Sequence, residues 1–171
     1  MNYFELFEIP VSLIPDQSKL SSRYPDLQKK YREDSLSNGG QETGEMAENL
    51  SAIEKGFKIL NDPGETTKYV LLLKGMLKEE EKYELPVDFL NQMMELSEGL
   101  KDDDILNLEE LETKMFQHQN NLYHEVRHIF EGYNDDTVTP GQLLQVKDYY
   151  FKKKYLEGIL ERLEGIRNIA R

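Results

Sequence analysis

Apolar residues recur at helical spacing along most of the chain. The first stripe lies on one face of a helix, at i, i+4, i+7 and i+11, and consists of Leu20, Tyr24, Leu27 and Tyr31. A loop signal follows at residues 37–40, and a second helical pattern runs from Gly44 to Leu60. Two apolar faces joined by a polar loop predict an antiparallel helical hairpin.

Local signals place the ends of these first helices. Apolar residues around Tyr3 and Phe4 predict a short first helix, and Asp16 is a candidate N-cap for the helix after it. Pro25 interrupts that helix, so we expect a kink near Ser21 or Ser22, or a restart at the proline. A short apolar helix is expected after Pro63, with Gly75 as its C′ glycine.

The second half of the chain predicts three more helices. A charged run at residues 76–85 separates them from the first half and is expected to be a connector. Helices are then expected over about 86–100, 102–132 and 139–171, the last beginning with a capping box, Thr139-Pro140-Gly141-Gln142. Together they predict a three-helix bundle. The whole chain therefore predicts an all-α, L-shaped protein, with domains at 1–75 and 86–171.

Composition narrows the classes of function. The chain has 171 residues, no cysteine and a net charge of −12, of which −3 falls in residues 1–75 and −9 in residues 76–171. Such a surface repels phosphate backbones, so no nucleic-acid partner is expected. We also found no apolar run long enough for a membrane span and no targeting signal at the start, which predicts a cytoplasmic protein.

Several segments of the sequence resemble those of a known protein family. The start Tyr3-Phe4-x-Leu-Phe, the run Leu27-Gln-Lys-Lys-Tyr31, the second hairpin helix and the short helix from Tyr69 resemble the J domain of HscB proteins, co-chaperones of iron–sulfur cluster assembly. The resemblance covers the whole chain, because an all-helical C-terminal domain follows in that family too. It implies a non-enzymatic adaptor without cofactor or metal.

The resemblance implies a surface for an ATP-driven chaperone of the HscA/DnaK class. The J-domain tripeptide His-Pro-Asp, which triggers the chaperone's ATPase, corresponds to Arg32-Glu33-Asp34 at the expected start of the loop, so only the aspartate matches. The expected chaperone-binding residues are Arg23, Lys29, Lys30, Arg32, Glu33 and Asp34. A solvated helix face is the alternative interpretation of the basic residues. Because two of the three side chains differ, we expect ATPase stimulation to be weak or absent.

A second surface is expected on the helix that begins near Pro86. Phe89 and Met93 lie on its inward stripe, whereas Leu90 and Met94 form a second stripe that the bundle does not need. In the family, the matching helix presents apolar side chains to the iron–sulfur scaffold protein IscU. The expected scaffold-binding residues are Leu90, Met94, Glu95, Glu98 and an aromatic of the last helix, either Phe151 or Tyr150. Additional core is the alternative for the second stripe.

Two further functions stay open. The chain could be a J-like relic that binds or inhibits the scaffold without contacting a chaperone. The run His124-Glu125-Val126-Arg127-His128 matches His-Glu-x-x-His, in which two histidines one turn apart bind zinc and the glutamate acts as a base. Because Val126 lies on the core stripe and a third ligand is missing, solvated histidines are the preferred interpretation. The chain is accordingly predicted to be a co-chaperone, with a zinc hydrolase as the weakest alternative.

Overall fold

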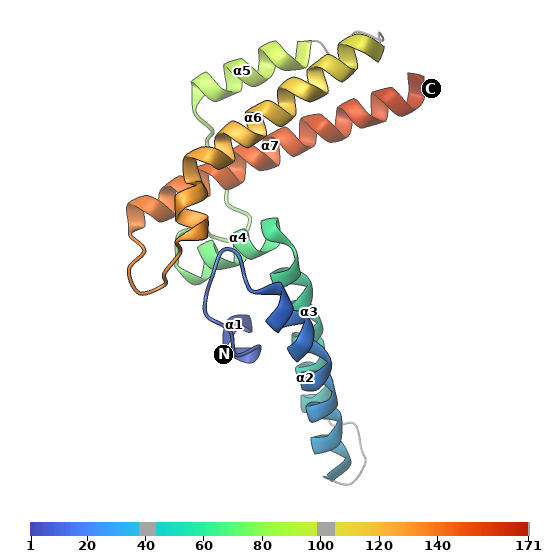
Figure 1. The fold of residues 1–171 in the computed structure, drawn as a ribbon, viewed down its shortest axis with the longest axis vertical. Coiled ribbons are helices and arrows are strands. Elements are labelled where there is room, and N and C mark those ends of the chain that lie inside the picture. The colour runs from blue at the N-terminus through green and yellow to red at the C-terminus, as the bar shows by residue number, and fades with distance from the viewer. Residues whose placement is uncertain (38–43, 99–104, 171) are drawn as a thin grey trace. The chain divides into compact units, whose positions relative to one another are not determined.

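The structure is a computed structural model that describes residues 1–37, 44–98 and 105–170. Within these ranges the only regular secondary structure is helical, as the sequence predicts (Figure 1). The helices are α1 (Tyr3–Leu6), α2 (Gln17–Ser37), α3 (Gly44–Asn61), α4 (Pro63–Leu73), α5 (Val87–Ser97), α6 (Ile105–Glu131) and α7 (Pro140–Ala170).

The helices belong to two compact units. The first contains Met1–Lys74 together with Phe130–Val138, and the second contains Gly75–Ile129 together with Thr139–Arg171. The chain thus enters the first unit twice, because the turn between α6 and α7 packs there. The second unit includes residues 76–85, which the charge pattern predicted to be a connector.

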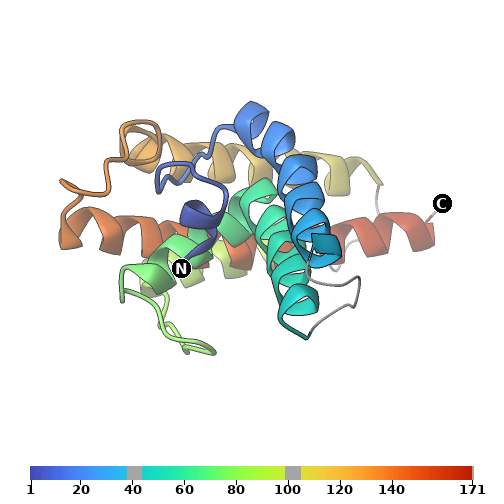
Figure 2. The same cartoon turned by 90° about the horizontal axis from the view of Figure 1, so that it is seen from below.

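The first unit is built on the predicted hairpin of α2 and α3, which lie side by side (Figure 2). The rings of Tyr24 and Phe57 stack between them, with centroids 4.1 Å apart. Helix α1 approaches α3 so closely that a Cβ on Gly56 would lie 2.8 Å from the ring of Tyr3. The side chains that fill this core are Phe4, Phe7, Leu13, Leu20, Ile53, Leu60, Val70 and Leu71.

Helix α2 runs without interruption from Gln17 to Ser37, so the predicted restart at Pro25 is wrong, while the alternative, a kink near Ser21 or Ser22, stays a prediction. A proline removes one backbone hydrogen bond from a helix. Before Pro25, Leu20 is buried and Tyr24 stacks on Phe57, and after it Leu27 is half-buried, and this packing holds the segment helical.

The predicted loop at Arg32-Glu33-Asp34 is also wrong, because these residues lie in the last turns of α2. Glu33 stands where the family motif has proline, and its backbone keeps the N–H that an α-helix needs to continue. Its side chain lies 3.9 Å from Lys29 at i, i+4 spacing, a pair that supports a helix weakly. The helix therefore continues past the triplet.

Most predicted helix ends are confirmed. The Asp16 carboxylate accepts a hydrogen bond from the N–H of Lys19, as an N-cap does. At Thr139, the hydroxyl accepts from the N–H of Gln142 while the Gln142 side chain accepts from the N–H of Thr139, both at 3.1 Å. Gly75 follows α4 with a φ of +71°, a conformation that glycine adopts without strain. The predicted helix start at residues 102–104 lies outside the described residues.

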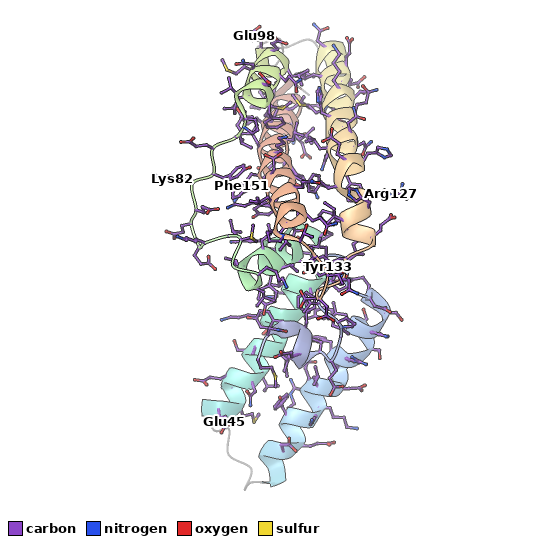
Figure 3. The ribbon with its side chains drawn as sticks, turned by 90° about the vertical axis from the view of Figure 1, so that its left-hand side faces the viewer. Glu45, Lys82, Glu98, Arg127, Tyr133 and Phe151 are labelled. Atoms are coloured by element: carbon purple, nitrogen blue, oxygen red, sulfur yellow. The ribbon has the colours of Figure 1, made fainter. Side chains whose placement is uncertain are left out.

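The second unit is the predicted three-helix bundle. Its core is formed by one stripe from each helix, consisting of Phe89 and Met93 in α5, Leu108, Leu111 and Met115 in α6, and Leu156, Ile159 and Leu163 in α7. Helices α6 and α7 form a long hairpin, and the shorter α5 lies along them (Figures 1 and 3). Each helix therefore has faces that the bundle leaves open.

Candidate protein-binding surfaces

The end of α2 carries exposed basic side chains. Lys29, Lys30 and Arg32 are all exposed. The ion pair between Lys29 and Glu33 joins side chains that are 76% and 63% exposed, so it neutralises little of this charge. This part of the expected chaperone-binding set lies on one helix and is accessible to a partner.

Arg23 differs from the other basic residues of α2. Its guanidinium donates hydrogen bonds to the backbone carbonyls of Phe7, at 2.6 Å, and Glu8. Glu8 has a φ of +54°, so the chain turns sharply at this point after α1. Arg23 thus holds the segment after α1 against α2, a structural role that its sequence pattern did not reveal.

Helix α5 has one buried face and one exposed face. Met93 is fully buried and Phe89 nearly so, as the inward stripe predicted. Met94 is 61% exposed, Leu90 is half-buried, and Glu95 and Glu98 are exposed. An exposed methionine beside carboxylates makes this face suitable for an adaptable apolar contact with charged surroundings.

Phe151 of α7 is half-buried and contacts the segment before α5. Its ring stacks on Tyr83, with centroids 4.6 Å apart and planes 11° from parallel, and it meets Tyr150 edge-on at 5.1 Å. The Tyr83 hydroxyl donates a hydrogen bond to Asp148, 2.9 Å away. Desolvation, followed by this hydrogen bond, raises the pKa of Tyr83 to about 12. Sequence reasoning missed Tyr83, although it is the one aromatic residue in the charged run 76–85.

An ion pair attaches the same segment to α7. Glu81 lies 2.7 Å from Lys147, and both side chains are largely buried, at 25% and 12% exposed. The lysine also lies over the ring of Tyr83, 5.6 Å from its centroid. Residues 81–83 are therefore part of the second unit's packing, and Tyr83 covers one face of the predicted binding residue Phe151.

Two of the four lysines of α7 are paired along their own helix. Lys152 lies 2.6 Å from Asp148, and Lys153 lies 3.8 Å from Glu157, each at i, i+4 spacing. Lys154 lies 6.0 Å from the centroid of the Tyr150 ring. This arrangement is that of a helix face with its own counterions.

The His-Glu-x-x-His run lies on the outside of α6. His124, Glu125 and His128 are exposed, whereas Val126 is buried, as its stripe predicted. In the part of the chain that the structure describes, no three histidine, aspartate or glutamate side chains come together as a metal site would require. No helix in the same ranges is long and apolar enough to cross a membrane.

Comparisons with known proteins agree with this fold. The family described as "HSCB C-terminal oligomerisation domain" matches residues 85–164. A co-chaperone protein HscB homolog of Shewanella woodyi is 28% identical over 173 residues, which cover 97% of each chain. A homolog of Vibrio cholerae with the same name is 36% identical over 104 residues. That match covers 59% of this chain and 60% of the relative, so the stronger similarity spans about three fifths of the relative's length.

Two solved structures share the fold over nearly the whole chain. Human co-chaperone protein HscB has a TM-score of 0.72 and 25% identity, covering 96% of this chain and 81% of that one. Chaperone HscB from Vibrio cholerae has a TM-score of 0.71 and 23% identity over the full length of both chains. The fold and these matches define a helical protein of the co-chaperone class. Within that class, the chain is similar to HscB proteins over nearly its whole length.

Proposed function

We propose that this chain is a co-chaperone of iron–sulfur cluster assembly that binds a scaffold protein of the IscU type and delivers it to an HscA/DnaK-class chaperone. The scaffold surface consists of Leu90, Met94, Glu95 and Glu98 of α5 with Phe151 of α7. The single observation that carries the proposal is the 61% exposure of Met94 on a helix whose opposite face is buried. Similarity to HscB co-chaperones supports the choice of partner.

Physical chemistry favours a partner over solvent at this face. Burial of apolar surface contributes about 25 cal/mol per Å², and Met94 and the half-buried Leu90 offer such surface without further folding. Methionine adapts its shape to irregular partners. The carboxylates of Glu95 and Glu98 flank the apolar residues and would select a partner with basic side chains at the rim.

The chaperone surface consists of Lys29, Lys30, Arg32, Glu33 and Asp34 at the end of α2. Exposed positive charge there would steer an acidic partner, and raised salt would weaken that attraction. A chain that holds the scaffold through one surface and the chaperone through the other raises their effective concentration for each other. Delivery by this route requires no chemistry from the co-chaperone.

The scaffold surface is tested by the double substitution Leu90→Ala with Met94→Ala. We expect calorimetry with purified IscU-type scaffold to show at least a roughly tenfold loss of affinity, because two apolar contacts are removed. The melting temperature should change little. Met93→Ala is the matched control in the same helix: it should lower stability by about 2–5 kcal/mol, because Met93 is fully buried. Unchanged binding by the double variant would refute the assigned surface.

The second candidate function is scaffold binding without chaperone activation. It is favoured by the replacement of His-Pro-Asp by Arg32-Glu33-Asp34 within α2. Single-turnover ATP hydrolysis by the chaperone should then rise little when this chain is added. A full response of the kind given by an HscB protein with His-Pro-Asp would exclude this candidate. Pull-down separates the two functions, since recovery of chaperone together with scaffold supports the first, and scaffold alone supports the second.

A further inference from the structure

The second unit has an open groove between α6 and α7 that the proposed function does not use. Its volume is about 420 Å³, and its apolar floor is formed by Phe116 of α6 and Leu160 of α7. Phe116 is 49% exposed, which is unusual for a phenylalanine beside a well-packed core. The groove contains no residue of α5, and the α7 side chains that pack against α5 in the core are Leu156, Ile159 and Leu163. It is therefore separate from the surface around Met94.

Carboxylates line one wall of this groove. Glu157, Glu161 and Glu164 belong to α7 and stand at i, i+4 and i+7, so they share one face of the helix. Along the helix axis, Glu161 and Glu164 lie about 6 and 10.5 Å from Glu157, at a rise of about 1.5 Å per residue. Carboxylates at this spacing repel each other and destabilise the helix slightly. A cationic partner would remove that cost.

One end of the groove is already neutralised within the chain. Arg167 lies 2.9 Å from Glu112 of α6, and its side chain is only 18% exposed. Glu157 has Lys153 at 3.8 Å, a partly exposed pair that a partner's lysine could replace. Among the described residues, Glu161 and Glu164 have no ion pair, so two carboxylates of the lining stay uncompensated. The groove thus combines an exposed aromatic floor with an uncompensated acidic wall.

We infer that this groove is a docking site for a cationic amphipathic helix of a partner protein, with lysine or arginine at i, i+4 and i+7 beside an apolar stripe. The basic residues would pair with Glu157, Glu161 and Glu164, and the apolar stripe would cover Phe116 and Leu160. A helix in a groove between two helices packs by interdigitating ridges. The site is independent of the scaffold surface.

The test uses the full chain and a designed probe. The probe is a fluorescein-labelled, alanine-based helical peptide with lysines at i, i+4 and i+7 and a leucine stripe beside them. A second peptide has the same composition in an order that disperses both stripes. Fluorescence anisotropy should show binding of the patterned peptide about tenfold tighter than that of the dispersed one, and the difference should shrink as salt is raised. Equal binding of the two peptides would overturn the inference.

Variants locate the site. Replacing Glu157, Glu161 and Glu164 by glutamine should weaken patterned-peptide binding about tenfold and remove most of its salt dependence. Phe116→Ser should weaken it several-fold at every salt concentration. The matched controls are Leu144→Ala, which removes a side chain that is 53% exposed elsewhere on α7, and Glu79→Gln with Glu84→Gln. These controls should bind normally, and loss of binding by them would overturn the assignment.

Three further measurements distinguish this groove from the scaffold surface and from a self-association surface. The Leu90→Ala, Met94→Ala variant should bind the peptide normally, so that failure of the scaffold proposal and failure of this inference remain distinguishable. Peptide-induced NMR shifts should centre on Phe116 and Leu160, and shifts centred on α5 would overturn the inference. Sedimentation should show that the chain does not self-associate through this groove. Self-association that Phe116→Ser abolishes would overturn the inference, because the occupant would then be a second copy of the chain.

Discussion

The guanidinium of Arg23 donates hydrogen bonds to the backbone carbonyls of Phe7 and Glu8, 16 and 15 residues earlier in the chain. These two carbonyls lie after α1, where the chain turns through a positive φ at Glu8. Hydrogen bonds from a charged donor are stronger than neutral ones. The side chain thus fixes the position of α1, which in turn covers Gly56 of α3.

Substitution of Arg23 tests this role. Arg23→Ala should lower the free energy of unfolding by about 1–3 kcal/mol, because two carbonyls lose a charged donor. Urea unfolding followed by circular dichroism measures the change. The control is Lys29→Ala on the same helix, which should change stability by less than about 0.5 kcal/mol, since its ion pair is exposed. Equal effects of the two substitutions would contradict the structural role of Arg23.

Tyr83 and Tyr149 link stability to alkaline pH. Desolvation is the largest cause that raises the pKa of each to about 12 from an ordinary value of 10.0. Between these two values the unfolded chain releases protons that the folded chain keeps, so stability falls as pH rises. The contribution is fully present below pH 10 and is lost as pH rises toward 12.

Unfolding measured at a series of alkaline pH values should show this decline. Tyr83→Phe removes one of the tyrosines whose pKa is raised in the folded chain and should make the decline between about pH 10 and 12 shallower. It also removes a hydrogen bond to Asp148, so it should lower stability at neutral pH by about 1 kcal/mol. Tyr155→Phe, at a more exposed position of α7, provides the matched control. An identical alkaline decline in wild type and Tyr83→Phe would refute the linkage.

At the scale of elements, α2 continues through the triplet that corresponds to the His-Pro-Asp of HscB proteins. The helix includes Arg32-Glu33-Asp34 and ends at Ser37. A proline at position 33 would remove the N–H needed for the helix, and it would disfavour helical geometry at the residue before it. The altered triplet therefore changes both the side chains offered to a chaperone and the backbone that holds them.

Restoring the family motif should shorten the helix. In the variant Arg32→His with Glu33→Pro, we expect the amides of residues 34–37 to lose protection in hydrogen exchange, because α2 would end near Tyr31. If the triplet alone limits activation, the variant should also stimulate chaperone ATP hydrolysis more than wild type does. Arg32→His alone should leave the helix intact. Retained protection at residues 34–37 in the double variant would contradict the physical reason given for the long helix.

At the scale of the whole chain, the two units are not two consecutive halves of the sequence. Residues 130–138 belong to the first unit, although they connect α6 and α7. Within that unit Lys74 lies 3.1 Å from the Asp135 carboxylate and donates to the Asp135 carbonyl at 3.3 Å. Tyr133 also donates to the Asp135 side chain, at 2.9 Å. A cut after Lys74 separates these partners.

A fragment of residues 1–74 should accordingly be less stable than the same residues in the full chain. Hydrogen exchange at the buried residues Val70 and Leu71 should be faster in the fragment. In the full chain, Lys74→Ala should reproduce part of this loss, about 1 kcal/mol, because the ion pair is partly shielded from water. Equal exchange in fragment and full chain would show that residues 130–138 contribute nothing to the first unit.

The sequence by itself determined the helices, most of their ends and the buried stripe of each. The Asp16 cap, the Thr139–Gln142 box and the stripe of Phe89 and Met93 depend on residues within a turn or two of each other, and helical periodicity reports such relations directly. For the same reason, the open face of α5 around Met94 could be predicted as a candidate site.

Only the tertiary structure decided what the side chains contact across longer separations. Arg23 binds carbonyls beyond its own helix, Tyr83 packs on α7 some 65 residues later, and residues 130–138 join the first unit. The groove beside Phe116 likewise requires α6 and α7 to lie next to each other. Periodicity says which face of a helix is buried, but it carries no information on which distant segment covers that face, because that choice depends on shape and charge in three dimensions.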